Sequence, residues 1–189
     1  MPDVKVLAGT NKKPASKASK YFIFMTEGFL IFLPQSLLTK GWNRPSLVKL
    51  HWLLQVLGFC CIALGLIAVV TIKIIKGNPH FSFPHSITGL VAIIMAACTG
   101  IGGYVSRLKP HPKGPSLAQI KLGHVFFGMA SYVVGVAALV LGYFTSYFGK
   151  LVDYEWRLFI AVITVLVSTV AFVNASVGFY RRAKNLFNF

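Results

Sequence analysis

Four apolar stretches are the feature that most limits how this chain can fold. None of them contains Asp, Glu, Lys or Arg, and each has the length that an α-helix needs to cross about 30 Å of hydrocarbon at about 1.5 Å per residue. The four stretches are residues 51–72, 85–104, 123–144 and 158–180. The sequence therefore predicts an all-α membrane protein, built as a transmembrane helix bundle with four clear spans.

The composition agrees with a bilayer environment. Hydrophobic residues make up 56% of the 189 positions, more than a soluble core of this length buries. The net charge of +15 would suggest nucleic acid in a soluble chain, but here Lys and Arg lie mostly between the apolar stretches, where they mark topology. We therefore expect the lipid bilayer, and no nucleic acid, as a partner. The three cysteines lie within apolar stretches without CxxC spacing, so neither a zinc site nor a disulfide framework is expected.

The two ends of the chain differ from its middle. Residues 1–20 carry five lysines and are predicted to form a disordered basic tail. Residues 21–38 are apolar but short, and they contain a glutamate and a proline, so they are expected to form only a partial N-terminal apolar segment. We expect the membrane domain to cover residues 21–182 and a cytoplasmic tail to cover residues 183–189.

The distribution of Lys and Arg predicts the orientation of the helices. Cytoplasmic segments of membrane proteins carry an excess of these two residues. By this rule three segments are cytoplasmic, namely those with Lys40, Arg44 and Lys49, with Arg107, Lys109, Lys113 and Lys121, and with Arg181, Arg182 and Lys184. The pattern predicts an integral, multi-pass protein and leaves its membrane open between endoplasmic reticulum, vesicle and plasma membrane.

Three histidines, His51, His85 and His124, each stand at one end of an apolar stretch. An ionisable ring at the edge of a membrane helix is costly unless something binds it. Gly89 and Gly128 follow His85 and His124 by four residues, so each lies on the same helical face as its histidine and leaves room for a flat ligand. A histidine at a helix end often only reaches interfacial water, and this simpler alternative stays open for each of the three.

The orientation decides which histidines can cooperate. His51 and His124 both begin helices that rise from the cytoplasmic side, so they are expected at the same depth. Two neutral imidazoles on diagonally opposed helices can hold one planar metal macrocycle, which is the bis-histidine ligation of haem b. His85 begins its helix on the opposite side, where only His80 is close in sequence. One haem b is therefore expected, and a second has one candidate ligand.

Three short runs of sequence resemble the third, fourth and fifth helices of the cytochrome b561 family. They are LHWLLQ at residues 50–55, NPHFSFPHS at residues 78–86 and GHVFFG at residues 123–128. The resemblance extends through Arg181, and residues 25–38 resemble the second half of that family's second helix. It implies a six-helix fold with two haems held by four histidines, of which this chain lacks the first helix and the start of the second.

The resemblance also implies an activity, namely electron transfer from cytoplasmic ascorbate to ferric chelates or monodehydroascorbate on the other side of the membrane. His51 and His124 match the ligands of the cytoplasmic haem, and His85 matches one ligand of the outer haem. Because the redox chemistry belongs to the cofactor, no side chain is expected to act as a catalytic acid or base. The expected protein is an ascorbate-dependent ferric reductase, for which a homodimer is one possible state.

Three further residues are candidate substrate contacts. Lys49 matches a basic position near the family's ascorbate site, and Lys121 is a plausible helper, since an ascorbate anion needs cationic donors at the membrane surface. His80, together with Phe81, resembles the family's surface for electron exit. Both lysines are equally well explained as ordinary topology markers.

Two other classes of function stay open. The first is a non-catalytic membrane protein that has lost one or both haems and acts, if at all, by associating with a full-length partner that supplies the absent histidine. The second, a small transporter, is less favoured, because it would call for intramembrane charges or interrupted helices along a pathway. Apart from Glu27, the apolar segments show no such charge.

Overall fold

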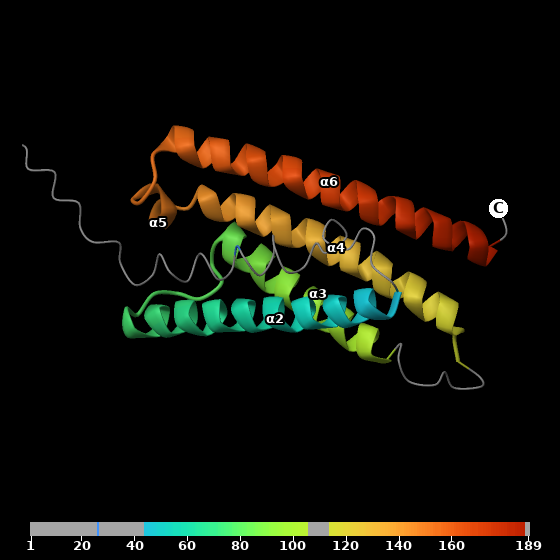
Figure 1. Cartoon of the computed structure of the whole chain (residues 1–189). Coiled ribbons are helices and arrows are strands. Elements are labelled where there is room, and N and C mark those ends of the chain that lie inside the picture. Colours follow the sequence, from blue (N-terminus) through green and yellow to red (C-terminus); the bar gives the residue numbers. More distant parts are fainter. Residues whose placement is uncertain (1–25, 27–43, 106–113, 188–189) are drawn as a thin grey trace, which may run out of the picture.

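The structure is a computed structural model that describes residues 44–105 and 114–187, together with residue 26. Its elements are the helices α2 (Arg44–Ile75), α3 (Pro84–Val105), α4 (Leu117–Tyr143), α5 (Ser146–Gly149) and α6 (Tyr154–Phe187), shown in Figure 1. Within this described part, all helices but α5 are long and apolar enough to cross a membrane. The predicted all-α bundle with four spans is therefore confirmed, and the chain is an integral, multi-pass membrane protein.

The N-terminal predictions fall outside the described residues. Of residues 1–43 only Thr26 is described, and it is helical. The basic tail and the partial apolar segment therefore stay predictions. At the other end, α6 continues through Phe187, so residues 183–187 of the expected cytoplasmic tail are helical.

Local sequence explains where two of the long helices begin and end. After α2 the chain turns at Gly77, whose φ of +63° lies in the left-handed region that glycine adopts at little cost. The backbone N–H of Asn78 donates to the carbonyl of Lys73 at 3.0 Å, as in a Schellman motif. At the start of α4, Ser116 and Gln119 form a capping box, in which the Ser116 N–H donates to Gln119 Oε1 at 2.7 Å and the Gln119 N–H donates to Ser116 Oγ at 3.3 Å.

Helix α4 is the centre of the packing. Both α3 and α6 pack along it, whereas α2 touches α3 at few points; Figure 1 shows α4 and α6 side by side. On α6 the buried residues between positions 161 and 171 are small and recur every three or four positions, so they form one face. They are Ala161, Thr164, Ser168 and Ala171. Small residues let two membrane helices approach closely, which explains why α6 lies against α4 along this face.

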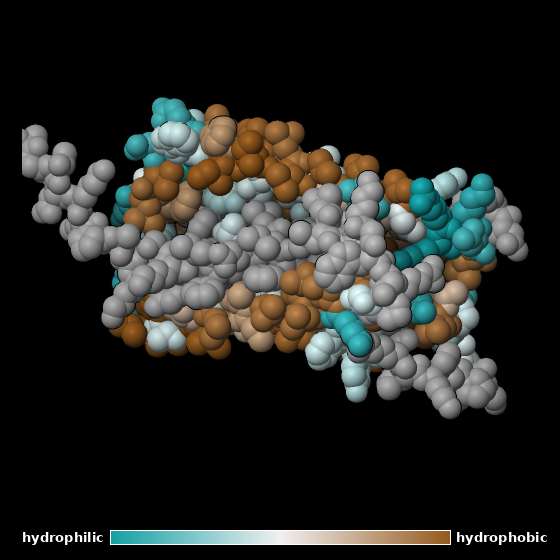
Figure 2. Space-filling view, in the orientation of Figure 1, coloured by the Kyte–Doolittle hydropathy of each residue, from teal (hydrophilic) through white to brown (hydrophobic). Residues whose placement is uncertain are grey.

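The outer surface of the described helices suits lipid. Large apolar side chains such as Leu64 and Ile67 are 58% and 63% exposed, while Ile62 and Tyr143 are almost fully buried between helices. Figure 2 shows hydrophobic residues over the middle of the molecule and hydrophilic residues gathered towards its two ends. This distribution is the one expected for a bundle that spans a bilayer.

Candidate metal centre

His124, near the start of α4, is held by the neighbouring helix. Its ring is partly buried, and Nδ1 lies 3.0 Å from the backbone carbonyl oxygen of Thr99 in α3. A carbonyl oxygen can only accept a hydrogen bond, so Nδ1 carries the proton and donates it. This tautomer leaves the lone pair of Nε2 free, which is the form of imidazole that binds a metal.

A glycine makes room for the His124 ring. A Cβ atom added to Gly103 would lie 2.8 Å from His124 Cε1 and 3.2 Å from Nδ1. Gly103 follows Thr99 by one helical turn, so the carbonyl and the missing side chain belong to the same face of α3. The ring therefore rests directly on the backbone of α3, and a larger residue at position 103 would have to displace it.

His85, near the start of α3, has the same surroundings with the two helices exchanged. Its Nδ1 lies 2.8 Å from the carbonyl oxygen of Ala138 in α4. A Cβ atom added to Gly142 would lie 2.9 Å from His85 Cε1 and 3.1 Å from Nδ1. By the same reasoning the proton is on Nδ1 and the Nε2 lone pair is free.

The two histidines thus belong to a repeated unit. His85 precedes Gly103 by 18 residues, and His124 precedes Gly142 by 18 residues. Because α3 and α4 run in opposite directions, each helix carries a histidine at its start and supports the other helix's histidine near its end. Eighteen residues of helix span about 27 Å, so the two supported rings lie close to opposite surfaces of the bilayer.

His51, on α2, lies beside His124. The two ring centres are 6.2 Å apart and the ring planes are nearly perpendicular, at 87°. Two imidazoles that bind opposite sides of one metal ion, each through a nitrogen at about 2 Å, have ring centres roughly 6 Å apart. The spacing of this pair therefore fits a metal held between them.

The chemistry of the donor set favours a macrocycle over a bare ion. Within residues 44–105 and 114–187, no group of three or more His, Cys, Asp or Glu side chains could hold a metal ion. A bare ion between His51 and His124 would therefore have only these two protein ligands among the described residues, whereas a haem supplies four nitrogens of its own and needs only two from the protein.

His85 is supported in the same way as His124, but its ring contacts no second imidazole in the part of the chain that the structure describes. His80, the neighbour expected from the sequence, is exposed, and its ring lies 6.3 Å from that of Phe81. The structure therefore brings together His51 and His124, and it does not pair His85 with His80.

The expected lysines lie at the same end as the His51 and His124 pair. Lys49 is exposed on α2, two residues before His51, and Lys121 is exposed on α4, one turn before His124. Arg182, near the far end of α6, is close enough for its charge to act on His124. This arginine was expected only as a topology marker, and the return of α6 to the end of the bundle that holds His124 explains its position.

The sequence reasoning missed Gly103, Gly142 and the two carbonyl acceptors. The equal spacing of 18 residues from each histidine to a glycine was the available signal. It becomes meaningful only once α3 and α4 are known to be antiparallel neighbours, because the contacts cross between the helices.

Comparisons with known proteins show which sequences this chain resembles. Residues 18–149, which include all three helix-end histidines, match the family model for eukaryotic cytochrome b561. The chain is 31% identical over 176 residues to the transmembrane reductase CYB561D2 of Mus musculus, across 92% of this chain and 78% of that protein. Human CYB561D2 matches with the same identity and coverage. The lysosomal membrane ascorbate-dependent ferrireductase CYB561A3 of Mus musculus is 29% identical over 107 residues, which is 56% of this chain and 44% of that protein.

Proposed function

The chain belongs to the cytochrome b561 family, and from this premise we propose that it moves electrons across a membrane as a haem b-dependent reductase. Its relatives include transmembrane reductases, which supports an oxidoreductase. The observation that carries the proposal is the pair of His51 and His124, with ring centres 6.2 Å apart and with Nε2 of His124 left free by the Thr99 carbonyl.

In this proposal His51 and His124 would hold a haem near the cytoplasmic surface. Haem iron held by two imidazoles supplies reversible one-electron transfer. The Thr99 carbonyl keeps His124 in the metal-binding tautomer and fixes the direction of its ring, and Gly103 allows the close approach that this contact requires. His85, supported by Ala138 and Gly142, is proposed as one ligand of a second haem near the opposite surface.

We further propose cytoplasmic ascorbate as the electron donor. Lys49, Lys121 and Arg182 place three cations at the end of the bundle that holds the His51 and His124 pair. Such a cluster attracts an anionic donor to the membrane surface beside the ligand pair. The similarity to an ascorbate-dependent ferrireductase supports the same donor, with a ferric chelate or monodehydroascorbate as the acceptor on the other side.

The loop between α2 and α3 is the proposed place of electron exit. It carries exposed His80 and ends two residues before His85. Phe81 has a φ of 50°, a region uncommon for a bulky residue, and Lys73 Nζ donates to the Pro79 carbonyl at 3.0 Å. The loop is thus held in a defined shape that presents His80 outward, which suits contact with a soluble acceptor.

A second function has one observation in its favour, namely that His85 contacts no second imidazole among the described residues. A chain with an incomplete outer site would be reducible from the cytoplasm yet unable to deliver electrons, and it would act through a full-length partner. Counting the haems bound to each polypeptide separates this alternative from the main proposal.

The test is a reduced-minus-oxidised visible spectrum of the purified chain, with haem quantified per polypeptide and titrated with ascorbate. We expect a b-type band that His51→Ala and His124→Ala each remove from the ascorbate-reducible fraction, while the exposed control His80→Ala keeps it. A second haem per chain would indicate a completed His85 site. Haem retained in both ligand variants would contradict the ligand assignment, and no haem after adequate supply would leave the non-catalytic alternative.

A further inference from the structure

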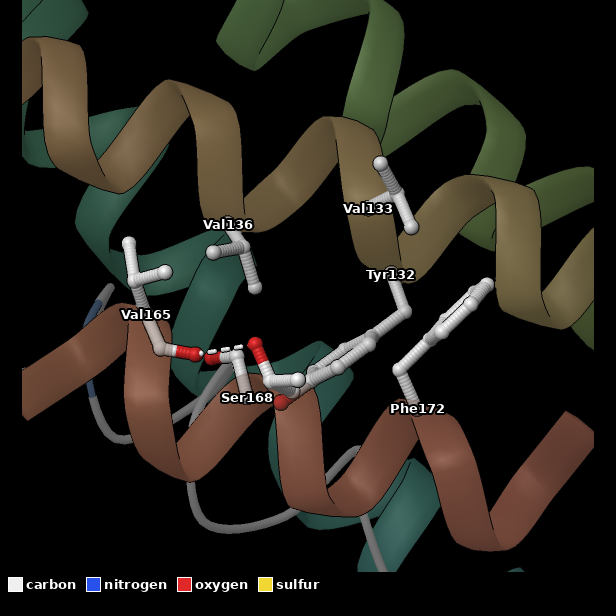
Figure 3. Close-up of a pocket in the computed structure, with 7 residues that line it drawn as sticks. Tyr132, Val133, Val136, Val165, Ser168 and Phe172 are labelled. Atoms are coloured by element: carbon white, nitrogen blue, oxygen red, sulfur yellow. Dashed lines mark hydrogen bonds between the residues drawn. The ribbon is translucent and has the colours of Figure 1, made fainter.

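A cavity of about 210 Å³ lies between α4 and α6, away from the histidines. Its walls are mostly apolar, and Figure 3 shows Tyr132 reaching from α4 towards Ser168 on α6. The lining residues are Tyr132, Val133, Val136, Val165, Ser168, Thr169 and Phe172. Tyr132 and Ser168 both lie near the middle of their helices, so this α4–α6 cavity is at the centre of the bilayer.

Two hydroxyl groups in this cavity have no hydrogen-bond partner in the part of the chain that the structure describes. They belong to Tyr132 and to Ser168, which is only 5% exposed. The two side chains are close enough to interact, but their contact does not have the geometry of a hydrogen bond. Both oxygens are covered by neighbouring atoms, so a ligand atom contacts the two hydroxyls only when these side chains rotate towards the cavity.

Four other hydroxyls in the membrane helices are satisfied within their own helix. Thr71, Thr99, Thr169 and Ser176 each donate at 2.8 Å to the carbonyl four residues earlier. This bond is the usual solution for Ser and Thr in a membrane helix, where water is not available. Ser168 could make the same bond and does not, although Thr169 beside it does. Its hydroxyl is therefore left without the partner that this bond would supply.

The cavity is open to lipid and has the size of a single ring. Val133 and Val165, which line it, are 49% and 46% exposed on the outer surface of the bundle. A cavity of roughly 150 Å³ is enough for a benzene ring, so the α4–α6 cavity can hold a substituted ring. Apolar walls with a few placed polar groups are typical of sites for small organic ligands.

We propose that the α4–α6 cavity binds a neutral, lipid-soluble, single-ring molecule of the quinone class, whose carbonyl oxygen accepts hydrogen bonds from Tyr132 and Ser168. A carbonyl oxygen has two lone pairs, so it can satisfy both hydroxyls at once. The apolar walls cover the ring, and the lipid-facing opening is the entrance from the bilayer. The site is independent of the histidines and needs no haem.

The test is calorimetric titration of the full chain in lipid nanodiscs with duroquinone, a tetramethyl quinone that resists addition by cysteine thiols. Durene, the same ring without oxygens, is the matched control ligand. We expect saturable binding of duroquinone that is about tenfold weaker in Ser168→Ala and again weaker in Tyr132→Phe, since each substitution removes one hydrogen bond. Ser176→Ala is the matched control variant, because Ser176 lies on α6 outside the cavity lining, its hydroxyl already donates to the Phe172 carbonyl, and its loss should leave duroquinone binding unchanged.

Several results would overturn the proposal. One is the absence of saturable duroquinone binding, which would mean that the hydroxyls pair with each other or hold water. Another is equal affinity for duroquinone and durene in the wild-type chain. A third is a loss in Ser176→Ala as large as that in Ser168→Ala, which would assign the effect to the packing of α6 alone. Circular dichroism of each variant shows that the helices are intact, and Tyr132→Phe keeps the ring that fills the space.

Discussion

Replacing Gly103 with alanine would displace the His124 ring without changing the histidine itself. The added Cβ would lie 2.8 Å from Cε1 of the His124 ring. Carbon atoms in contact normally stay about 3.5 Å apart, so the ring must retreat by about 0.7 Å or tilt. The hydrogen bond from Nδ1 to the Thr99 carbonyl, now 3.0 Å, would then pass beyond bonding distance.

The size of the effect follows from what that hydrogen bond does. Groups that orient a metal-binding histidine typically contribute roughly 10- to 100-fold to metal affinity. We therefore expect Gly103→Ala to weaken haem binding at the His51 and His124 site by a similar factor, or about 1.4 to 2.8 kcal/mol. Alanine favours a helix over glycine by about 1 kcal/mol, so the helix itself should not be weakened.

Gly102→Ala is the matched control, because a Cβ atom at Gly102 meets nothing within 4 Å. It gives the neighbouring position of α3 the same gain in helix propensity without the contact to His124. Haem titration into each purified variant, followed by the b-type difference spectrum and the midpoint potential, measures the outcome. Wild-type haem affinity in Gly103→Ala, or an equal loss in Gly102→Ala, would refute the reasoning.

Three further predictions concern other parts of the bundle. Gly142→Ala should lower haem occupancy at the proposed His85 site and spare the proposed site of His51 and His124, because the three atoms nearest to an added Cβ all belong to His85, and separate potentials in a redox titration would show this. Lys49→Gln and Lys121→Gln should each raise the KM for ascorbate roughly two- to fivefold at low salt. The effect should vanish at high salt, because salt screens the attraction between exposed charges. Lys150 is exposed at the opposite end, so the control variant Lys150→Gln should leave the KM unchanged. Ser116→Ala removes the capping box of α4 and should destabilise the protein by about 1 kcal/mol in chemical denaturation, with no change in the haem spectrum.

Much of the fold could be predicted, because the local composition of the sequence is enough to identify a membrane helix. A run of about 20 residues without charge must satisfy its backbone within itself, so it must be a helix. The start of α4 at Leu117 was not predicted, because the apolar stretch begins only at residue 123, although Ser116 and Gln119 have the spacing of a capping box. What could not be predicted is which helices touch. Nothing in the sequence of α6 says that Ser168 faces α4, because packing between apolar helices depends on fine shape.

The candidate metal centre likewise has a part that could be predicted from the sequence and a part that could not. The shared depth of His51 and His124 followed from the orientation rule, and their rings do lie side by side, although their role as haem ligands stays a prediction. The role of the Thr99 and Ala138 carbonyls as hydrogen-bond acceptors could not be predicted, because every residue type has a backbone carbonyl. The sequence shows that positions 103 and 142 are glycines, but not that Gly103 and Gly142 make room for a histidine ring, because that ring belongs to the neighbouring helix.

The exchange of support between α3 and α4 has a consequence for how the protein tolerates mutation. Since the acceptors are main-chain atoms, positions 99 and 138 can hold residues as different as Thr and Ala and still perform one task. We therefore expect different residue types at positions 99 and 138 in natural variants, but almost always glycine at positions 103 and 142, one turn later. A substitution near the end of α3 or α4 would also affect the histidine of the neighbouring helix and not the histidine of its own helix. For example, a substitution at Gly103 on α3 disturbs His124 on α4, although His85 is the histidine that α3 carries.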